Sequence, residues 1–306
     1  MKTKHCLLTN DVETTSIWFN SLRDETGQKV LEEGMPILLD IYARYNVKST
    51  FFFTAYIADR FPEIVKMIIR DGHEVASHGK SHIKENGFDV MPLHKQKEHL
   101  DYSKKLLEDI SGLEVVSFRA PALRVNNDTV QALVETGFKY DSSVASQRFD
   151  FFMSFGGIKK LNWLAAPRLP YRVSEDSIFR KGQSPLIEIP LTALVTPYVG
   201  TTMRIMPGYT AFQRRILHLE TRLTGKPIVF DIHPNEFIDE TEEPRVIERR
   251  SSNPLTYLMQ DWIRSKLKVK NLGDSAIPLY EDMVSFYAEQ RYQFSTIREY
   301  GESLKV

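Results

Sequence analysis

Apolar residues recur along the chain in a repeated order, in which a stretch with helical spacing ends at a glycine and a short apolar run follows. In one instance Ile64, Val65 and Ile68 have helical spacing, Gly72 follows them, and the next apolar run ends near Ser77. A glycine adopts the left-handed conformation that ends a helix with little steric strain, so we expect it to mark the end of each helix. The same order occurs in RDGHEVASH, ISGLEVVSFRAP, ETGFKYDSS and LTGKPIVFDIH. This alternation favours parallel strands joined by crossover helices.

Three further apolar runs extend the pattern. HCLLTN precedes Asp11, STFFFTAY follows a helical stretch at about residues 28–45, and LIEIP covers residues 186–190. Together these runs predict an α/β fold, a distorted (β/α) barrel of about seven parallel strands with a helical extension at its C-terminal end.

One domain over residues 1–306 is expected, with the barrel in residues 5–235 and further helices in residues 236–306, near 254–268 and 278–291. A segment that interrupts the alternation, residues 146–180, is rich in aromatic side chains: Phe149, Phe151, Phe152, Phe155, Trp163 and Tyr171. Two interpretations stay open for it, a loop that covers the substrate and a long connection whose aromatic residues pack on the barrel.

Ionisable residues stand at the carboxyl ends of the predicted strands. In chain order they are Asp11 and Glu13, His78, Arg119, Asp141 and His233. In a barrel of β/α units these strand ends converge on one face, where catalytic groups come from several strands. The sequence therefore predicts an active site made of these side chains.

The segment from His78 to His82 carries two histidines at the i, i+4 spacing, which puts them on one face if the backbone turns helical after the strand. For an isolated pair of this kind, two solvated loop histidines are the competing interpretation. Here the pair follows a helix, a glycine and a strand, so a metal site is favoured. Two imidazoles and one carboxylate, from Asp11 or Glu13, would leave a position open for water on a divalent ion.

Asp11 and Glu13 are two residues apart, so both side chains point to the same face of a strand. One carboxylate is expected to bind the ion and the other to take a proton from water. His233 lies on a different strand and can protonate the leaving group from the other side. Arg119 could hold the base carboxylate through a bidentate pair, and Asp141 could orient His233. A structural ion pair between Arg119 and Asp141 is the competing interpretation for these two residues.

Composition limits the choice of partners. Lys plus Arg and Asp plus Glu both total 40, so no net charge draws the chain to nucleic acid or to an anionic membrane, although a local basic patch is compatible with this balance. The one cysteine, Cys6, excludes an internal disulfide. The apolar run at the N-terminus is too short for a signal peptide and no stretch is long enough to span a bilayer, so a cytoplasmic protein is expected.

The order of these motifs resembles the polysaccharide deacetylases, the NodB-homology fold of carbohydrate esterase family 4. The segments that carry the resemblance are Thr9-Asn10-Asp11-Val12, Gly72-His73-Glu74 through His78 and His82, Arg119-Ala120-Pro121, Asp141-Ser142-Ser143 and Val229-Phe230-Asp231-Ile232-His233. Val12 stands where the family usually has a metal-binding Asp, and a branch with Asp-Val-Glu at this point is similar to the chain.

The resemblance implies a NodB-like barrel and metal-dependent hydrolysis, with Asp11 as base, Glu13, His78 and His82 as metal ligands and His233 as acid. It leaves open which of Asp11 and Glu13 binds the ion. One divalent ion is expected, zinc first, with cobalt, nickel, manganese or iron as alternatives.

The expected reaction is removal of an N-acyl group, N-acetyl first, from an amino sugar or from a cytoplasmic or lipid-linked glycan precursor. The alternatives are a deformylase of a lipid-linked amino sugar and an allantoinase-like cyclic amide hydrolase. An inactive barrel that only binds glycans belongs to a different class. A lipid-linked substrate would bring transient contact with a membrane, and the sequence does not indicate an oligomeric state.

Overall fold

The computed structural model describes residues 3–148, 162–245 and 264–304. The strands in these ranges are β1 (His5–Val12), β2 (Thr50–Phe53), β3 (Glu74–Ser77), β4 (Ser117–Phe118), β5 (Tyr140–Asp141), β6 (Tyr171–Ser174), β7 (Ser177–Lys181), β8 (Ile187–Glu188), β9 (Ala193–Leu194), β10 (Thr196–Pro197), β11 (Ile228–Ile232) and β12 (Gln293–Phe294). A ten-stranded sheet has the order β11-β1-β2-β3-β4-β5-β8-β6-β7, with β12 paired to β1 off this path. All strands from β11 to β8 in this order are parallel, which confirms the prediction from the alternating pattern.

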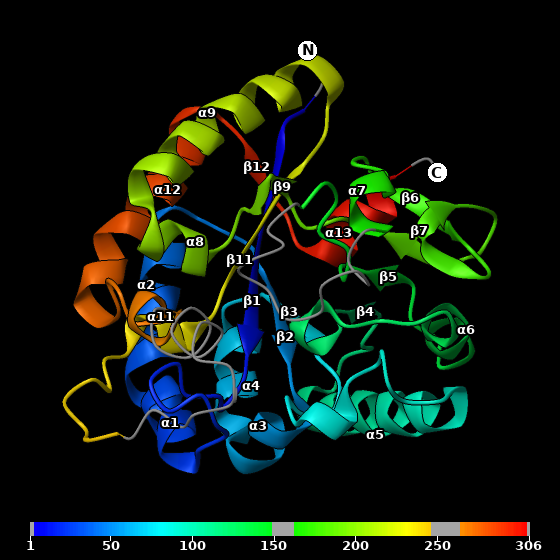
Figure 1. Cartoon of the computed structure of the whole chain (residues 1–306), viewed down its shortest axis with the longest axis horizontal. Helices are drawn as coiled ribbons and strands as arrows, with labels where there is room; N and C mark the ends of the chain where they lie inside the picture. The colour runs from blue at the N-terminus through cyan, green and yellow to red at the C-terminus, as the bar shows by residue number, and fades with distance from the viewer. Residues whose placement is uncertain (1–2, 149–161, 246–263, 305–306) are drawn as a thin grey trace, which may run out of the picture.

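Helices connect and cover these strands. They are α1 (Asp24–Lys29), the π-helical turn η1 (Val30–Gly34), α2 (Met35–Arg44), α3 (Ala55–Arg60), α4 (Pro62–Arg70), α5 (Leu93–Ser111), α6 (Asp128–Glu135), α7 (Asn162–Ala165), α8 (Gly200–Ile205), α9 (Pro207–Thr224), α11 (Arg264–Lys268), α12 (Ala276–Glu289) and α13 (Ile297–Ser303). The short 3-10 turns are η2 (Lys84–Asn86), η3 (Pro121–Leu123), η5 (Pro234–Phe237) and η7 (Gly273–Ser275). Figure 1 shows β1, which lies between β11 and β2 in the sheet, near the centre of the view, with α2, α9 and α12 on one side of it and α5 and α6 on the other.

Four glycines end helices where the sequence predicted helix ends. Gly72, Gly112, Gly137 and Gly225 have φ angles of 72°, 68°, 79° and 78°, in the left-handed region that glycine enters without strain. They follow α4, α5, α6 and α9 and precede β3, β4, β5 and β11. The helix–glycine–strand pattern is therefore confirmed at each of its occurrences.

The parallel strands are covered on both faces. Every residue of β2 and of β11 is buried, as are Cys6, Leu7 and Leu8 of β1. Because side chains of a strand point alternately to the two faces, a strand that is buried throughout must have packed layers on both. The uninterrupted apolar runs of the sequence follow from this requirement.

The C-terminal elements pack on the first strand. β12 pairs with the start of β1, where Gln293 lies opposite His5. Tyr280 of α12 shares a 2.7 Å hydrogen bond between hydroxyl groups with Tyr42, which donates to Asn10 Oδ1 of β1 at 2.8 Å. These buried contacts join the end of the chain to the strand that carries Asp11.

The sheet curls into a distorted half-barrel. Beyond β8, the backbone amide of Thr192 donates to the Val229 carbonyl of β11 at 3.0 Å. The Val229 amide in turn donates to Thr192 Oγ1 at 2.9 Å. The two ends of the parallel order thus approach each other through a short contact rather than a full strand pair.

Several local expectations differ from the structure. The antiparallel hairpin of β6 and β7 was not predicted. The predicted helix near residues 278–291 is α12, which begins and ends two residues earlier. The helix predicted near 254–268 is described only from Arg264, and residues 246–263 lie outside the described ranges.

The aromatic segment at residues 146–180 is described in part. Trp163 and Tyr171 are both 2% exposed and pack in the core, which favours the packing interpretation for these two side chains. Phe149, Phe151, Phe152 and Phe155 lie outside the described residues.

Within the described ranges, none of the helices combines the length and the apolar composition needed to cross a bilayer. Cys6 is fully buried in β1, and burial raises the pKa of its thiol, so it is a core side chain.

Candidate active site

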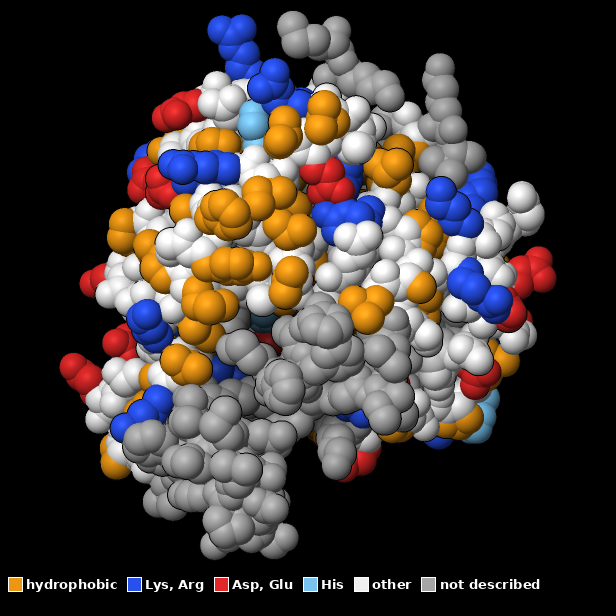
Figure 2. Space-filling model, turned by 45° about the horizontal axis from the view of Figure 1, so that its top comes forward, with side chains coloured by type: hydrophobic (Ala, Val, Ile, Leu, Met, Phe, Trp, Pro, Cys, Tyr) orange, Lys and Arg blue, Asp and Glu red, His pale blue; other side chains and the backbone are white. Residues whose placement is uncertain are grey.

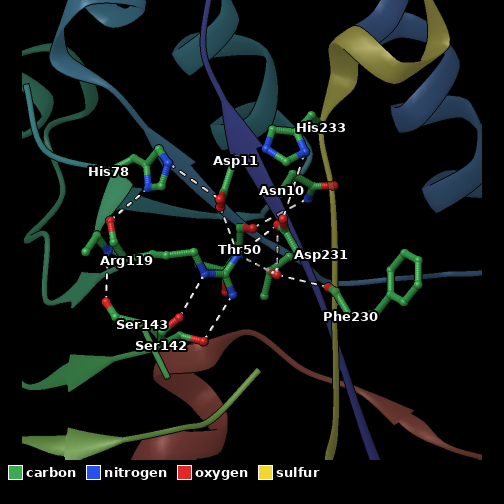
Figure 3. Close-up of polar contacts among 12 residues, drawn as sticks. Asn10, Asp11, Thr50, His78, Arg119, Ser142, Ser143, Phe230, Asp231 and His233 are labelled. Atoms are coloured by element: carbon green, nitrogen blue, oxygen red, sulfur yellow. Dashed lines mark hydrogen bonds and ion pairs between the residues drawn. The ribbon is translucent and has the colours of Figure 1, made fainter. Parts of the chain in front are cut away.

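The ionisable residues predicted at strand ends meet at one edge of the sheet. Asp11 and Glu13 come from the end of β1, where Asp11 pairs in register with Phe52 of β2. His78 follows β3 and His233 follows β11. Figure 3 shows His78 and His233 on opposite sides of Asp11, with Arg119 close to Asp11. Because parallel strands have their carboxyl ends at the same edge of the sheet, residues that are far apart in sequence lie close together here.

Arg119 connects two carboxylates through one nitrogen. Its Nη1 donates to Asp11 Oδ1 and to Asp231 Oδ1, each at 2.8 Å, and also to Thr9 Oγ1 at 2.9 Å. Its Nε and Nη2 donate to the carbonyl and hydroxyl oxygens of Ser142, each at 3.0 Å. The expected bidentate pair with a base carboxylate is therefore wrong in its geometry, because the other two nitrogens are used by the β5 loop. The guanidinium still holds Asp11 in place, and it is fully buried.

Asp231 was not among the predicted site residues. It lies two positions before His233 on β11, so the same alternation that joined Asp11 and Glu13 could have indicated it. Burial opposes the charged form of Asp11, but His78 and Arg119 outweigh it and hold the pKa of Asp11 well below its usual range. Burial and the charge of Asp11 raise the pKa of Asp231. The negative charge beside Arg119 therefore belongs mainly to Asp11.

His78 and His82 face each other across a short distance. Their Nε2 atoms are 2.9 Å apart, and His78 Nδ1 lies 2.8 Å from the Arg119 carbonyl oxygen. A proton on Nδ1 of His78 would satisfy that carbonyl and leave the lone pair of Nε2 directed into the site. Burial lowers the pKa of both imidazoles to about 4, so both are neutral at neutral pH.

The backbone between these histidines is not helical, contrary to the expectation for an i, i+4 pair. After His78 the chain makes a loop in which Gly79 has a φ of 68°. A Cβ on Gly79 would lie 3.1 Å from the Phe88 ring, so a larger residue is opposed both by the conformation and by the space. The left-handed turn at Gly79, rather than a helical turn, brings His82 back towards His78.

Glu13 lies between the two groups of histidines. Its Oε2 is 3.1 Å from His82 Nε2 and accepts a hydrogen bond from Thr15 Oγ1 at 2.7 Å. Its Oε1 is 3.7 Å from His233 Nε2. Burial raises the pKa of Glu13. Asp11 Oδ2 is 3.5 Å from His78 Nε2, so each carboxylate contacts one imidazole of the pair.

His233 is surrounded by carboxylates. Its Nδ1 lies 3.3 Å from Glu236 Oε1 and 3.9 Å from Asp231 Oδ2. Burial opposes the charged imidazole, yet the hydrogen bond with Glu236 and the charges of Asp231, Asp11 and Glu13 raise the pKa of His233 to about 10. His233 is therefore positively charged at neutral pH.

Glu236 is held by a buried arginine that sequence reasoning did not single out. Arg204 of α8 donates through Nε to Glu236 Oε2, and both side chains are 1% exposed. Arg204 Nη1 also donates to the carbonyls of Lys268 and Lys270, at 2.9 and 2.8 Å. Although burial opposes its charged form, Arg204 and His233 lower the pKa of Glu236 to about 2. The spacing His233-Pro-Asn-Glu236 at the start of a helical turn is the signal that could have indicated Glu236.

Asp141 does not have its predicted role. Its carboxylate accepts hydrogen bonds from the backbone N and Oγ of Ser143, at 3.1 and 2.7 Å. The amide of Ala120, next to Arg119, donates to Ser143 Oγ at 2.8 Å. The ion pairs that His233 makes in the described residues are with Glu13, Asp231 and Glu236. The expectation that Asp141 orients His233 is therefore wrong, and Asp141 supports the backbone at Arg119 instead.

Two sets of side chains offer ligands to a divalent ion. In the described residues, the donors whose ligand atoms all lie within 4.8 Å of one another are Asp11, Asp231 and His233. This set is a poor cation site, because Arg119 already donates to both aspartates and His233 is itself charged. The predicted set is chemically more suitable, since His78 and His82 are neutral imidazoles and the Glu13 carboxylate is adjacent.

The chain is similar to known proteins over part of its length. Residues 13–140, which include Glu13, His78, His82 and Arg119 but end before Asp141 and His233, match the family model described as polysaccharide deacetylase. The peptidoglycan deacetylase of Helicobacter pylori is 31% identical over 146 residues, 45% of the chain and 49% of that relative. The chain thus spans about half the length of this curated relative.

Two solved structures share the fold. One, described as a putative polysaccharide deacetylase from Mycobacterium smegmatis, has a TM-score of 0.66 at 19% identity and covers 98% of the chain and 90% of its own. An allantoinase has a TM-score of 0.58 at 14% identity over 97% of the chain and 89% of its own. At these identities the similarity establishes the NodB-like fold alone.

Proposed function

Since the chain belongs to the polysaccharide deacetylase family, we propose that it is a metal-dependent hydrolase that removes an N-acyl group from an amino sugar. The observation that carries the proposal is the contrast around Asp11. The neutral imidazole of His78 lies on one side of Asp11 and the charged imidazole of His233 lies on the other (Figure 3), and the neutral imidazole of His82 is 2.9 Å from that of His78. Amide hydrolysis needs both kinds of group, because water must be activated and the departing amine must be protonated.

Glu13, His78 and His82 are the proposed ligands. When bound, a divalent ion would lower the pKa of a water molecule and polarise the acyl oxygen. Zinc suits one carboxylate and two imidazoles, and cobalt, nickel, manganese and iron are the alternatives. His78 keeps Nε2 directed at the site because its Nδ1 lies against the Arg119 carbonyl at 2.8 Å.

Asp11 is the proposed base. The carboxylate is anchored by Arg119 through Oδ1, which leaves Oδ2 near His78 to accept a proton. A carboxylate in a fixed position can take the proton of the attacking water without first having to be reoriented. Glu13 is the competing candidate for this role, because burial raises its pKa and makes it the stronger base of the two.

His233 is the proposed acid. Its proton would be donated to the leaving nitrogen, since the amine is expelled from the tetrahedral intermediate only after protonation. Glu236 fixes the ring from the side of Nδ1, so that Nε2 points towards Glu13 and the centre of the site. The raised pKa keeps this acid protonated at neutral pH.

The proposed substrate is an N-acetylated amino sugar in a glycan or a glycan precursor. The name of the Helicobacter pylori relative makes fragments of peptidoglycan the first compounds to test. A location in the cytoplasm and a lipid-linked form of the substrate stay predictions from the sequence. N-formyl amino sugars and cyclic ureides are the competing substrate classes, the latter because an allantoinase shares the fold.

A metal analysis joined to a substrate panel tests the proposal. Purified protein is stripped with a chelator, reloaded with single divalent ions, and assayed for release of acetate, formate or ring-opened product from the three classes. We expect about one ion per chain and acetate release that depends on it. Full turnover by metal-free protein would contradict the metal role, and binding of glycans without any hydrolysis would favour an inactive binding protein.

A further inference from the structure

Helix α9 (Pro207–Thr224) has several apolar residues on its solvent-exposed face, whereas a helix that only packs on a core has its apolar residues on the buried face. Its buried residues are Thr210, Gln213, Leu217 and Thr221, most of which are polar. Its exposed residues include Phe212, Ile216, Leu219 and Leu223, which are 58%, 38%, 53% and 77% exposed. They are spaced i, i+4, i+7 and i+11, so they form one continuous stripe on the outer face.

Two segments that contact α9 carry further exposed apolar residues. Gln213 donates to the carbonyls of Leu194 and Thr196, at 3.2 and 2.9 Å, which fixes the turn between β9 and β10 against the helix. Val195 at the tip of this turn is 54% exposed. Its φ of 65° is unfavourable for a β-branched residue, so the turn presents this apolar side chain in spite of backbone strain.

On another side of the helix, Arg168 binds Glu220 of α9 through two hydrogen bonds of 2.6 Å. Leu169, next to Arg168 in the chain, is 43% exposed. We call the six residues Phe212, Ile216, Leu219, Leu223, Val195 and Leu169 the α9 surface. Figure 2 shows hydrophobic side chains gathered on the face of the molecule that includes α9, with charged side chains at the border.

The exposed charges of α9 are all positive. Arg215 and Arg222 are exposed beside the stripe, whereas the helix's one acidic residue, Glu220, is engaged by Arg168 and Lys226. An occupant of the α9 surface must therefore offer apolar groups together with negative charge.

We propose that the α9 surface docks on a bilayer that contains anionic phospholipid. The apolar stripe would enter the boundary between headgroups and acyl chains, and Arg215 and Arg222 would lie at the level of the lipid phosphates. A second copy of the chain fits less well, because pairing of α9 with itself would set arginines against arginines. The balanced net charge of the chain means that such binding depends on this local surface. The proposal does not depend on the catalytic function.

Co-sedimentation with lipid vesicles tests the proposal on the full chain. Vesicles of phosphatidylcholine alone are compared with vesicles that also contain phosphatidylglycerol, at low and high salt. We expect binding to the anionic vesicles, weakened by salt, and strongly reduced binding by a double variant, Leu219→Gln with Leu223→Gln. Arg215→Gln with Arg222→Gln should abolish the preference for anionic lipid. Leu113→Gln, at a leucine that is 46% exposed after α5, is the matched control and should bind like the unaltered protein.

Circular dichroism and a thermal melt show whether each variant is folded, which is expected because every altered side chain is exposed or partly exposed. Equal sedimentation with and without phosphatidylglycerol would overturn the proposal, as would equal losses in the α9 variants and the Leu113→Gln control. Light scattering tests the other occupant. A dimer that the leucine double variant converts to a monomer would assign the α9 surface to a second copy and overturn the lipid proposal.

Discussion

The histidines on the two sides of Asp11 have the same side chain and opposite charge behaviour. Burial lowers the pKa of His78 and of His82 to about 4. His233 is half-buried among polar groups, yet its pKa is raised to about 10. Burial acts in the same direction on all three rings, so it does not explain the difference.

The largest difference between His78 and His233 lies in the partner of Nδ1. In His78 this nitrogen faces a neutral backbone carbonyl, which can fix the tautomer but adds little to the stability of the charged ring. In His233 it faces the carboxylate of Glu236, which Arg204 keeps ionised. A charged partner stabilises the imidazolium and a neutral one does not. The first environment suits a metal ligand, and the second suits a proton donor.

The largest loss of activity is expected when one of the two neutral imidazoles, that of His78, is removed. His78→Ala should remove the bound ion and reduce the deacetylase rate to background, because the open site loses one of its two imidazoles. Metal content by mass spectrometry and kcat/KM on the best substrate are measured together. His94→Ala, at an exposed histidine of α5, is the control and should keep both. A His78→Ala protein that is active without metal would contradict the role of His78 as a metal ligand that activity requires.

The next effect separates the two carboxylates that lie between the histidines. Asp11→Asn should keep the ion and lower kcat by about 10²–10⁴-fold, the usual contribution of a general base. Glu13→Gln should instead weaken metal binding, since Oε2 of Glu13 lies 3.1 Å from His82 Nε2. The two variants are compared by metal titration and by steady-state kinetics. The reverse pattern, with metal lost only from Asp11→Asn, would exchange the two roles.

His233→Ala should remove the proton donor without disturbing the metal ligands. We expect the ion to stay bound and kcat for an amide substrate to fall by about 10²–10³-fold, within the range of general acid catalysis. A matched ester should lose much less, because an alkoxide leaves more readily without a proton. Rates on both substrates and the metal content are the measurements. Equal losses on amide and ester would contradict an acid role for His233.

The smallest effect is expected from Glu236→Gln, which alters the partner and leaves the imidazole in place. We expect a loss of about 10–100-fold in kcat, as for other groups that orient a functional side chain. The pH profile should also change. His233 holds its proton below a pH of about 10, so the acid is present at neutral pH and is lost as the pH rises through that value.

Removal of the Glu236 carboxylate should lower the pKa of His233. In Glu236→Gln the loss of activity at high pH, where His233 loses its proton, should therefore begin at a lower pH. Glu242→Gln, at a residue of the same segment outside the site, should leave the profile unchanged. If the high-pH part of the pH–rate profile is unchanged in Glu236→Gln, the Glu236 carboxylate does not determine the charge of the His233 imidazole.

The sequence was sufficient for the helix ends and strand ends of the alternating pattern, which depend on neighbours along the chain. Gly72, Gly112, Gly137 and Gly225 marked helix ends because a left-handed residue is a local requirement. Strand ends followed from the same pattern, and the parallel arrangement then placed Asp11, Glu13, His78, Arg119 and His233 at one edge of the sheet. Placing these residues at one edge needed only the spacing of apolar residues and the preference of glycine for the left-handed conformation.

Tertiary structure alone decided which of these groups touch. Asp141 and His233 both stand at strand ends, but Asp141 turns to Ser143, and His233 is held by Glu236 and, through it, by Arg204. Likewise the pattern of α9 indicates an apolar face and cannot say that this face points outward. Contacts between residues that are distant in sequence depend on strand order and on which side of a helix is covered. These are properties of the packed chain, and they fix the charge of each histidine.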